Sequence, residues 1–485
     1  MRLGELFERA GLEYPEHLSE ICVTGVVTDS RKAYGGCIFV CIKGNNSDGH
    51  DYIDQAVKNG AVVIVAEQVR DGCVGGAAII KIDNTRRAAA LLYNAQCENP
   101  SKDIKLIGVT GTNGKTSVCF MLQSIFGSAG KKCAVIGTLG CRVSQKNTEL
   151  CRGGLTTPDA SELYPLLSHL REMGVEYVFM EVSSHALSLS RVAPLQFEFA
   201  VFTNLTRDHL DFHGGMEEYF AAKSKLFEQC RRRVINVDDE YGKRLFDSYG
   251  DAISCSTSEG NAMASDIECR SDGTRYTLEY KNKKYKINLG ALGDFMVMNS
   301  LQAAVVAMEL GISSEHVQGG LSHFFGVEGR MQRIAFPECQ FDVIIDFAHT
   351  PDALERVLRC TRDLKKERGR IITVFGCGGD RDRGKRKQMA QVASRLADFV
   401  IVTSDNPRSE SPESIISDIL KGIDKEKPYK VIVTRRDAIE YALGEAREGD
   451  TVLLCGKGHE KYQITSDGKL PFDEEEIVRE ILKKQ

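Results

Sequence analysis

The stretch Lys105-Leu-Ile-Gly-Val-Thr-Gly-Thr-Asn-Gly-Lys-Thr116 decides how this sequence folds. Its first half is an apolar run that predicts a short buried strand, and its second half is a glycine loop. Gly111 and Gly114 allow the backbone to curl so that several N–H groups face an anion. Lys115 can reach a terminal phosphate, and Thr116 can offer its hydroxyl to a magnesium ion. The stretch therefore predicts a site for nucleotide phosphates.

A helix is expected directly after this loop, over residues 117–127. Apolar side chains recur there at helical spacing, and the helix N-terminus would point at the phosphates, where its dipole favours negative charge. Val109 stands where the general phosphate-loop pattern has its first glycine, so this loop is a variant. An ordinary glycine turn is the alternative. It is disfavoured because strand, loop, Lys-Thr pair and helix follow in the order that phosphate binding requires.

The composition bounds the class of protein. The 485 residues suggest about three domains. The net charge of −5 argues against nucleic acid as a partner, because no strong positive field would hold it. The N-terminal segment does not resemble a signal peptide, and no apolar run approaches the roughly 18 residues of a membrane span. We therefore expect a cytoplasmic protein without a membrane span. We also expect it to act as a monomer.

The sixteen cysteines are scattered along the chain, and none forms a C-x-x-C pair. Cys37 and Cys41 are the closest pair in sequence. Reduced thiols of a cytosolic protein are the favoured interpretation, and a zinc site is the alternative.

Residues 1–98 are predicted to form a first α/β domain. Two of its strands end in polar clusters, Thr28-Asp29-Ser30-Arg31 and Lys43-Gly-Asn-Asn-Ser-Asp48. Open α/β sheets hold ligands at such strand ends, although turn chemistry explains the second cluster equally well. The strands are expected at residues 23–28, 37–41, 61–66 and 78–82.

Residues 99–328 are predicted to form a second domain that begins with the phosphate loop. Two of its strands lead into the polar runs Glu181-Val-Ser-Ser-His185 and Asn204-Leu-Thr-Arg-Asp-His-Leu-Asp-Phe-His213. An unpaired carboxylate at Glu181 would be costly on so apolar a strand. Magnesium would satisfy it, and an ion pair with a local arginine is the alternative. His209 is a better candidate ligand than His213, which we interpret as structural.

The rest of the second domain is described by composition. Strands are expected at 133–136, 177–182, 199–204 and 234–237, and a β-ribbon at 255–287. Residues 217–230 predict a helix whose lysines, Lys223 among them, would be solvated surface residues. A later helix begins near Asn299.

Residues 329–485 are predicted to form a third domain with a parallel, doubly wound sheet. Strands are expected at 342–346, 371–375, 399–403, 430–433 and 451–454. Bare turns would not need arginines and carboxylates at every strand exit, so a crevice for a charged zwitterion or a phosphate fits better. Four exits carry the clusters Asp346-Phe-Ala-His-Thr-Pro-Asp352, Gly376-Cys-Gly-Gly-Asp-Arg-Asp-Arg-Gly384, Ser404-Asp-Asn-Pro-Arg408 and Gly456-Lys-Gly-His-Glu460.

Several of these motifs together resemble the Mur ligases, ATP-dependent enzymes that form amide bonds in peptidoglycan precursor synthesis. The resemblance covers essentially the whole chain. Thr156-Thr-Pro158, Gly378-Gly-Asp-Arg381, Asp405-Asn-Pro-Arg408 and Gly458-His-Glu460 are similar to the branch that adds diaminopimelate. The motifs shared with the whole family are Gly111-Thr-Asn-Gly-Lys-Thr116, Glu181-Val-Ser-Ser-His185, Asn204-Leu-Thr-Arg-Asp-His-Leu-Asp211 and Asp346-Phe-Ala-His-Thr-Pro351.

The resemblance implies a UDP-substrate domain, a central ATPase domain of P-loop type and a Rossmann-like amino-acid domain. It implies contacts of Ser30, Thr156, Thr157, Ser183 and Arg191 with UDP-N-acetylmuramoyl-L-alanyl-D-glutamate. It places ATP at Gly111, Thr112, Asn113, Gly114, Lys115, Thr116, Ser117, Asn299 and Arg330, with Asp346 and His349 close to the nucleotide. It places meso-diaminopimelate at Arg381, Asp405, Asn406, Pro407, Arg408, Gly456 and Glu460.

The resemblance also implies a catalytic centre containing Lys115, Lys223 and His209. Thr116, Glu181 and His209 are similar to magnesium ligands. Lys223 matches a lysine that carbon dioxide converts to a carbamate, and that carbamate would be a further magnesium ligand. Leu189 stands where some members of the family have a glutamine, and a leucine side chain cannot form the substrate hydrogen bond of that glutamine.

Two other kinds of function remain open at this point. One is another ligase of the superfamily, adding lysine or extending folylpolyglutamate, which the first domain and Asp405-Asn-Pro-Arg408 disfavour. The other is a nucleotide-dependent switch, which would not need the charged strand exits of the third domain.

Overall fold

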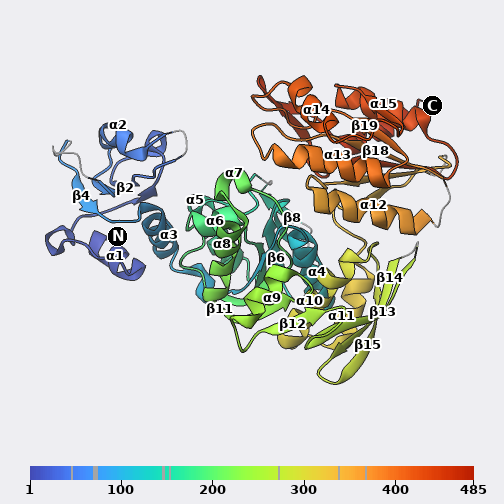
Figure 1. Ribbon diagram of the computed structural model, residues 1–485. Coiled ribbons are helices and arrows are strands. Elements are labelled where there is room, and N and C mark those ends of the chain that lie inside the picture. Colours follow the sequence, from blue (N-terminus) through green and yellow to red (C-terminus); the bar gives the residue numbers. More distant parts are fainter. Residues whose placement is uncertain are drawn as a thin grey trace. The chain divides into compact units, whose positions relative to one another are not determined.

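The computed structural model describes residues 1–44, 47–68, 75–144, 148–151, 154–270, 273–336, 339–365 and 369–484. The chain divides into two compact units, and Figure 1 follows it from the N-terminus in blue to the C-terminus in red. The first unit contains Met1–Thr110, Gly130–Val201 and Ala222–Arg233. The second contains Gly111–Ala129, Phe202–Ala221 and Val234–Gln485.

The N-terminal sheet has four parallel strands in the order β1-β2-β3-β4. Every residue of β2 and β3 is buried, as expected for short apolar strands of a parallel sheet covered on both faces. All four predicted strands are confirmed. The elements are α1 (Leu3–Ala10), β1 (Gly25–Val27), β2 (Cys37–Val40), α2 (Ile53–Lys58), β3 (Val63–Ala66), β4 (Ala78–Lys81) and α3 (Thr85–Gln96).

The central sheet has eleven strands in the order β15-β14-β13-β12-β11-β10-β5-β9-β6-β7-β8. Its β5, β9 and β6 strands are parallel, and β13, β14 and β15 form the predicted antiparallel ribbon. The strands are β5 (Lys105–Thr110), β6 (Cys133–Gly137), β7 (Gly140–Val143), β8 (Thr148–Cys151), β9 (Tyr177–Glu181), β10 (Phe197–Phe202), β11 (Cys230–Asn236), β12 (Ile253–Ser256), β13 (Ala262–Arg270), β14 (Gly273–Tyr280) and β15 (Lys283–Leu289).

In the described part of this region, eight helices lie between or after the strands in the sequence. The predicted helix after the glycine loop is confirmed and begins at Lys115, with Gly114 in the left-handed conformation before it. The helices are α4 (Lys115–Ser128), α5 (Ala160–Glu172), α6 (Ser184–Ser188), α7 (Leu210–His213), α8 (Met216–Glu228), α9 (Glu240–Asp247), α10 (Phe295–Glu309) and α11 (Ser314–Ser322).

The C-terminal sheet has six strands in the order β16-β17-β21-β18-β19-β20, all parallel except the edge strand β16. All five predicted strands are confirmed, and a hairpin, β22–β23, follows them. The elements are β16 (Gln332–Ile334), β17 (Asp342–Asp346), α12 (Pro351–Lys365), β18 (Ile371–Phe375), α13 (Gly384–Leu396), β19 (Phe399–Val402), α14 (Pro412–Leu420), β20 (Tyr429–Val431), α15 (Arg435–Glu445), β21 (Thr451–Cys455), β22 (Tyr462–Thr465), β23 (Gly468–Pro471) and α16 (Glu474–Leu482).

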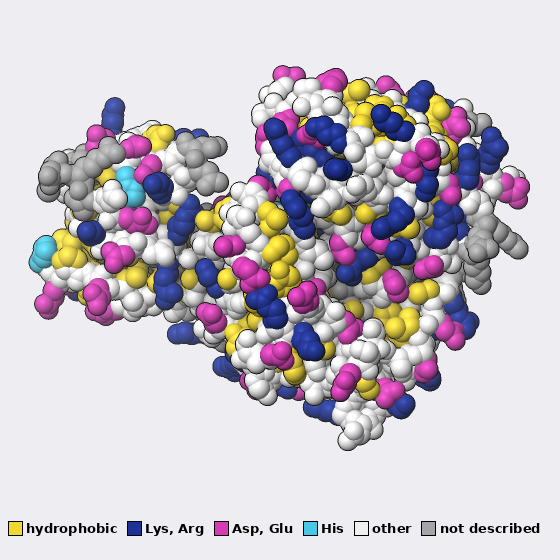
Figure 2. All heavy atoms as spheres, viewed as in Figure 1, with side chains coloured by type: hydrophobic (Ala, Val, Ile, Leu, Met, Phe, Trp, Pro, Cys, Tyr) yellow, Lys and Arg dark blue, Asp and Glu magenta, His cyan; other side chains and the backbone are white. Residues whose placement is uncertain are grey.

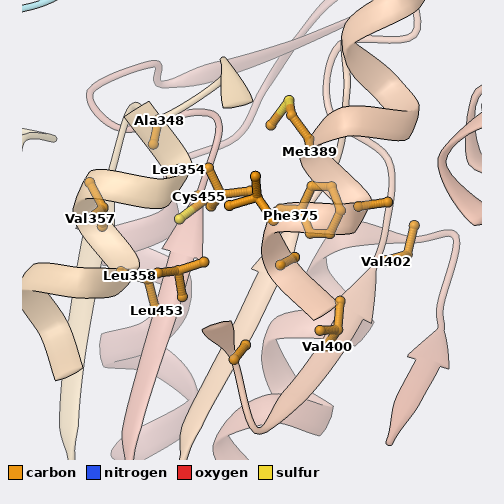
Figure 3. Close-up of a cluster of buried hydrophobic side chains, with 14 of the residues drawn as sticks. Ala348, Leu354, Val357, Leu358, Phe375, Met389, Val400, Val402, Leu453 and Cys455 are labelled. Atoms are coloured by element: carbon orange, nitrogen blue, oxygen red, sulfur yellow. The ribbon is translucent and has the colours of Figure 1, made fainter. Parts of the chain in front are cut away.

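Two hydrophobic layers cover this sheet, so it is doubly wound as predicted. One layer joins the sheet to α12, α13 and α14, and includes Leu354, Phe375 and Met389 (Figure 3). The other joins the opposite face to α15 and α16, and includes Ile439 and Val478. The faces of the sheet are therefore buried, and its polar residues lie at the carboxyl ends of the strands.

The visible surface carries basic and acidic side chains interspersed with one another (Figure 2), in keeping with a small net charge. Among the described residues, no helix combines the length and apolar character that crossing a membrane requires. No disulfide joins any two of the fourteen cysteines whose side chains the structure describes.

Candidate active site

Both glycines of the phosphate loop adopt backbone angles that other residues avoid. Gly111 has φ of 147° and Gly114 has φ of 86°. A Cβ atom on Gly111 would come within 1.9 Å of Thr203 Oγ1, and one on Gly114 within 2.4 Å of Asn299 Oδ1. Glycine is therefore required at both positions, and Asn299 of α10 lies against the loop.

The exit of β10 holds the phosphate loop. Asn204 O accepts from Thr112 N at 2.9 Å, and Asn204 Oδ1 accepts from Asn113 N at 3.0 Å. Asn204 Nδ2 donates back to Asn113 O at 3.2 Å. Lys115 Nζ donates to Gly111 O and Thr112 O, both at 2.9 Å, so its ammonium lies over the loop. The phosphate loop and the polar run that begins at Asn204 are far apart in sequence, and these hydrogen bonds join them.

Thr116 and Ser117 lie in the first turn of α4, and both are buried. They follow Gly114, the residue before the N-terminus of α4, where the helix dipole favours a negatively charged ligand.

Asp208 connects two of the predicted site residues. Its Oδ2 lies 3.3 Å from His209 Nε2 and 3.6 Å from His349 Nε2, and its Oδ1 lies 3.7 Å from Lys385 Nζ. Burial alone would raise the pKa of this carboxyl, but the neighbouring His349 and the positive charges of His209 and Lys385 hold the pKa well below its usual value. Asp208 and Lys385 were not among the predicted residues, although Asp208 stands in one polar strand exit and Lys385 directly follows another, at the start of α13.

Asp346 is buried at the end of β17 and is held by backbone donors. Its Oδ2 accepts from Met331 N and its Oδ1 from Ala348 N, both at 2.7 Å. Burial raises the pKa of Asp346, opposed by the charge of Arg330 and by those two donors. The Arg330 guanidinium lies 4.5 Å from the centre of the Phe347 ring.

Arg330 also lines a cavity of about 600 Å³. Apolar groups of Ala291, Met296 and Phe325 line the same cavity, and the Phe325 side chain is 77% exposed. Glu328, Gln332 and Arg333 also line the cavity, so it combines apolar and charged groups. Such a mixed cavity beside a guanidinium suits a flat aromatic ligand with polar edges.

Glu181 is 1% exposed at the end of β9, as the strand pattern predicts. Its Oε1 accepts from Thr138 N at 3.0 Å and its Oε2 from Thr138 Oγ1 at 3.2 Å. A Cβ atom on Gly137 would come within 2.1 Å of Oε1. A carboxylate has about four acceptor sites, so one that is oriented in this way is chemically suited to a hard cation.

The described residues contain no group of three or more His, Cys, Asp or Glu side chains arranged to hold a metal ion. Magnesium does not need such a group, because it usually keeps several waters and binds one or two carboxylates together with phosphate oxygens. The predicted donors Thr116, Glu181 and His209 fit that pattern by their chemistry.

Lys223 is 1% exposed, so the interpretation from composition as a solvated surface lysine is wrong. Its neighbours on α8 explain the difference, because Ala222, Leu226 and Phe227 are buried with it. An ammonium group in such surroundings is costly. Burial agrees with the role that the family resemblance implies, and the carbamate itself remains a prediction.

Four of the residues predicted for the UDP-linked substrate form one network. Thr157 Oγ1 donates to Glu181 O at 2.8 Å and accepts from Ser183 N at 3.0 Å. Thr156 Oγ1 lies 3.2 Å from Thr138 Oγ1, and Arg191 Nη1 donates to Thr157 O at 2.9 Å. This network ties the predicted substrate residues to the carboxylate that is predicted to bind magnesium.

The fifth residue predicted for this substrate, Ser30, belongs to the short 3₁₀ helix Ser30–Lys32 that follows β1. Ser30 is buried after β1, and its Oγ donates to Gln55 Oε1 at 3.2 Å. Leu189 ends α6 and donates its N–H to His185 O. Asn45 and Asn46, from the second polar cluster, lie outside the described residues.

Arg408 and Arg381 belong to neighbouring strand exits of the C-terminal sheet. Arg408 has φ of 56°, and its Nη1 donates to Gly379 O at 2.7 Å. Burial and the charge of Arg381 lower the pKa of Arg408. Among the described residues, neither arginine forms an ion pair with a carboxylate within 4.0 Å. Two adjacent guanidinium groups thus remain available to an anionic ligand.

The other residues predicted for the amino acid surround these arginines. Asp405 is buried, and a Cβ atom on Gly456 would come within 2.5 Å of its Oδ2. Glu460 Oε2 accepts from Asn406 Nδ2 at 2.7 Å. Pro407 is buried, and its carbonyl lies 1.9 Å from where a Gly379 Cβ would stand. The residues predicted for diaminopimelate therefore converge on one edge of the sheet.

Models of three domains match the chain in succession. The Mur ligase family catalytic domain matches residues 22–102, the Mur ligase middle domain residues 109–307, and the Mur ligase glutamate ligase domain residues 329–458. The chain belongs to the Mur ligase family. The middle-domain match contains the phosphate loop, Glu181 and His209.

Several relatives that are similar over nearly the whole chain are named UDP-N-acetylmuramoyl-L-alanyl-D-glutamate–2,6-diaminopimelate ligase. The protein of Syntrophomonas wolfei is 41% identical over 100% of this chain and 99% of its own length. That of Caldanaerobacter subterraneus is 43% identical over 99% of both chains. A solved structure of a ligase with this name is 31% identical, with a TM-score of 0.70 over 100% of this chain and 99% of its own.

Proposed function

We propose that this Mur ligase joins meso-diaminopimelate to the D-glutamate of UDP-N-acetylmuramoyl-L-alanyl-D-glutamate, with ATP as the energy source. The full-length similarity to ligases of that name supports the proposal. The reaction would supply cytoplasmic peptidoglycan precursor synthesis, with the protein acting as a monomer.

The observation that carries the choice of amino acid is the pair Arg381 and Arg408. Diaminopimelate has a carboxylate at each end, whereas lysine has only one. Arg381 would hold the carboxylate at the reacting end, and Arg408 the carboxylate at the far end. A planar guanidinium can form two parallel hydrogen bonds with a carboxylate, and a site that is built for such a pair rejects a ligand that lacks it.

We assign ATP to the phosphate loop and to the cavity beside Arg330. The loop N–H groups and Lys115 would hold the phosphates, and the cavity with Phe325 and Met296 would hold the base. Thr116, Glu181, His209 and a carbamate on Lys223 would hold magnesium, which would neutralise charge on the transferring phosphoryl group.

The proposed reaction has two balanced steps. The glutamyl carboxylate attacks the γ-phosphorus of ATP, the bond to the bridging oxygen breaks, and ADP leaves. The neutral amine of diaminopimelate then attacks the acyl carbon, loses a proton, and inorganic phosphate leaves with the former carboxylate oxygen. Positioning of the three substrates carries most of this catalysis.

We propose domain boundaries at residues 1–98, 99–328 and 329–485. The three family matches, at 22–102, 109–307 and 329–458, support this division, since each lies almost entirely within one proposed domain.

Release of ADP tests the proposed function directly. ADP is measured with ATP alone, with added UDP-muramyl dipeptide, and with the dipeptide plus one candidate amino acid. We expect sustained release only with the dipeptide and meso-diaminopimelate together. Equal release with ATP alone would indicate a nucleotide switch, and release with lysine or a folate substrate would indicate a different ligase.

A further inference from the structure

Lys457 is a buried lysine that the proposed reaction does not use. It follows Gly456 at the exit of β21, and its side chain is 0% exposed. Its Nζ donates to Asn406 Oδ1 at 3.1 Å and to Glu460 Oε2 at 3.2 Å. A lysine is almost never fully buried unless it is paired, so this position needs an explanation.

Two aromatic rings complete the surroundings of Lys457. Its Nζ lies 5.9 Å from the centre of the Tyr462 ring and 5.8 Å from that of Phe472. Aromatic faces attract a desolvated cation at such distances. The charge of Lys457 also helps to lower the pKa of Asp405, against the opposing effect of burial. The ammonium is therefore fixed in place from several sides.

Glu460 is held by one oxygen only. Its Oε2 accepts from Lys457 Nζ and from Asn406 Nδ2, whereas Oε1 accepts no hydrogen bond from the described residues. Asn406 is fixed in turn, because its Oδ1 also accepts from Ile464 N at 2.9 Å. Lys457 and Asn406 thus hold Glu460 through Oε2 and leave Oε1 as the oxygen that can accept a ligand hydrogen bond.

We infer that Lys457 is a positioning residue that orients Glu460 to accept the distal ammonium group of the amino-acid substrate. The inference rests on the proposed function and deepens it. Arg408 would recognise the distal carboxylate, and Glu460, oriented by Lys457, would recognise the amine on the same carbon. Lys457 itself touches neither.

Two analogues separate these recognitions. Lysine has the distal amine without the carboxylate, and 2-aminopimelate has the distal carboxylate without the amine. The experiment measures kcat/KM for meso-diaminopimelate, lysine and 2-aminopimelate in the full-length protein, with saturating ATP and UDP-muramyl dipeptide. The variants are Lys457→Met and Lys457→Gln. Methionine keeps most of the side-chain length but has no charge, and glutamine is neutral but keeps a hydrogen-bond donor. Lys469→Met is the control, because Lys469 is exposed and its Nζ lies 3.5 Å from the centre of the same Tyr462 ring.

In the wild type, we expect diaminopimelate to be preferred over 2-aminopimelate by about 10-fold or more, the usual value of a hydrogen bond to a charged group. Lys457→Met should abolish most of this preference through KM, and Lys457→Gln should reduce it less. The preference for diaminopimelate over lysine, and the KM values for ATP and the dipeptide, should stay as in the wild type. Lys469→Met should change none of these ratios.

The outcomes are distinguishable. A wild type that does not use diaminopimelate contradicts the proposed function. A wild type that prefers it, with Lys457→Met keeping the same preference over 2-aminopimelate, overturns the inference alone. An equal loss for all three amino acids also overturns it, since that marks a general structural role. If neither Lys457 variant folds, judged by circular dichroism with ATP present, Lys457 has a general structural role and the inference is overturned.

Discussion

Thr138 donates to both carboxylate oxygens of Glu181, through its backbone N–H at 3.0 Å and its hydroxyl at 3.2 Å. A side chain that orients a metal ligand in this way changes metal affinity when it is removed. Thr138→Val keeps the shape and the backbone bond but loses the hydroxyl. We expect the magnesium concentration for half-maximal activity to rise about 10-fold or more.

Thr138→Ser retains the hydroxyl and serves as the matched control. It should behave as the wild type in the same magnesium titration. An unchanged magnesium requirement in Thr138→Val would show that Glu181 does not contact the metal.

Lys115→Ala should remove the charge that Lys115 places over the phosphate loop. We expect kcat to fall about 10²-fold or more, as for the loss of a single electrostatic group at a transferring centre. Ligation rates and thermal unfolding are measured together, with the exposed Lys105→Ala as control. Near-normal turnover with an intact fold would exclude the loop from catalysis.

Lys223→Ala should be nearly inactive if a carbamate forms at this buried position. Short carboxylates added in solution should partly restore activity, because their oxygens can replace those of the carbamate. The exposed Lys225→Ala should keep its activity. Full activity of wild-type protein after exhaustive removal of carbon dioxide and bicarbonate would argue against the modification.

Two ion pairs between α15 and α16 differ in burial and provide a matched test of stability. Arg435–Glu474, at 2.8 Å, is fully buried, whereas Arg436–Glu480, at 2.7 Å, is largely exposed. Glu474→Gln should destabilise the protein by about 3–5 kcal/mol, because it leaves a buried guanidinium without its countercharge. Glu480→Gln should lower the free energy of unfolding only slightly, because solvent screens this exposed pair. Urea unfolding of both variants measures the difference, and equal midpoints would contradict the expectation.

Apolar runs made most of the sheet predictable. Strands such as β18 and β21 are buried along their whole length, so composition alone identifies them. The hairpin β22–β23 was not predicted, because its residues are half-buried or exposed and carry no apolar pattern. It nevertheless shapes the site, since Ile464 O accepts from Arg408 N.

The candidate site was predictable where a motif carries its own signal, as in the phosphate loop. Lys457 and Lys223 could not be recognised as buried from composition, because a lysine is usually a surface residue. Their burial depends on neighbours brought from distant segments, such as Asn406 beside Lys457. Asp208 was missed for the same reason, since its contact with Lys385 joins two segments that are far apart in sequence.

The ratio of kcat/KM for meso-diaminopimelate to that for lysine tests the central claim most directly. It is measured in the wild type, in Arg408→Ala and in the surface control Arg395→Ala. We predict a wild-type ratio of roughly 10²-fold or more, because lysine leaves the Arg408 guanidinium without its carboxylate. Arg408→Ala should bring the ratio close to unity, and Arg395→Ala should leave it unchanged. Equal use of both amino acids by the wild type, or an unchanged ratio in Arg408→Ala, would contradict the account.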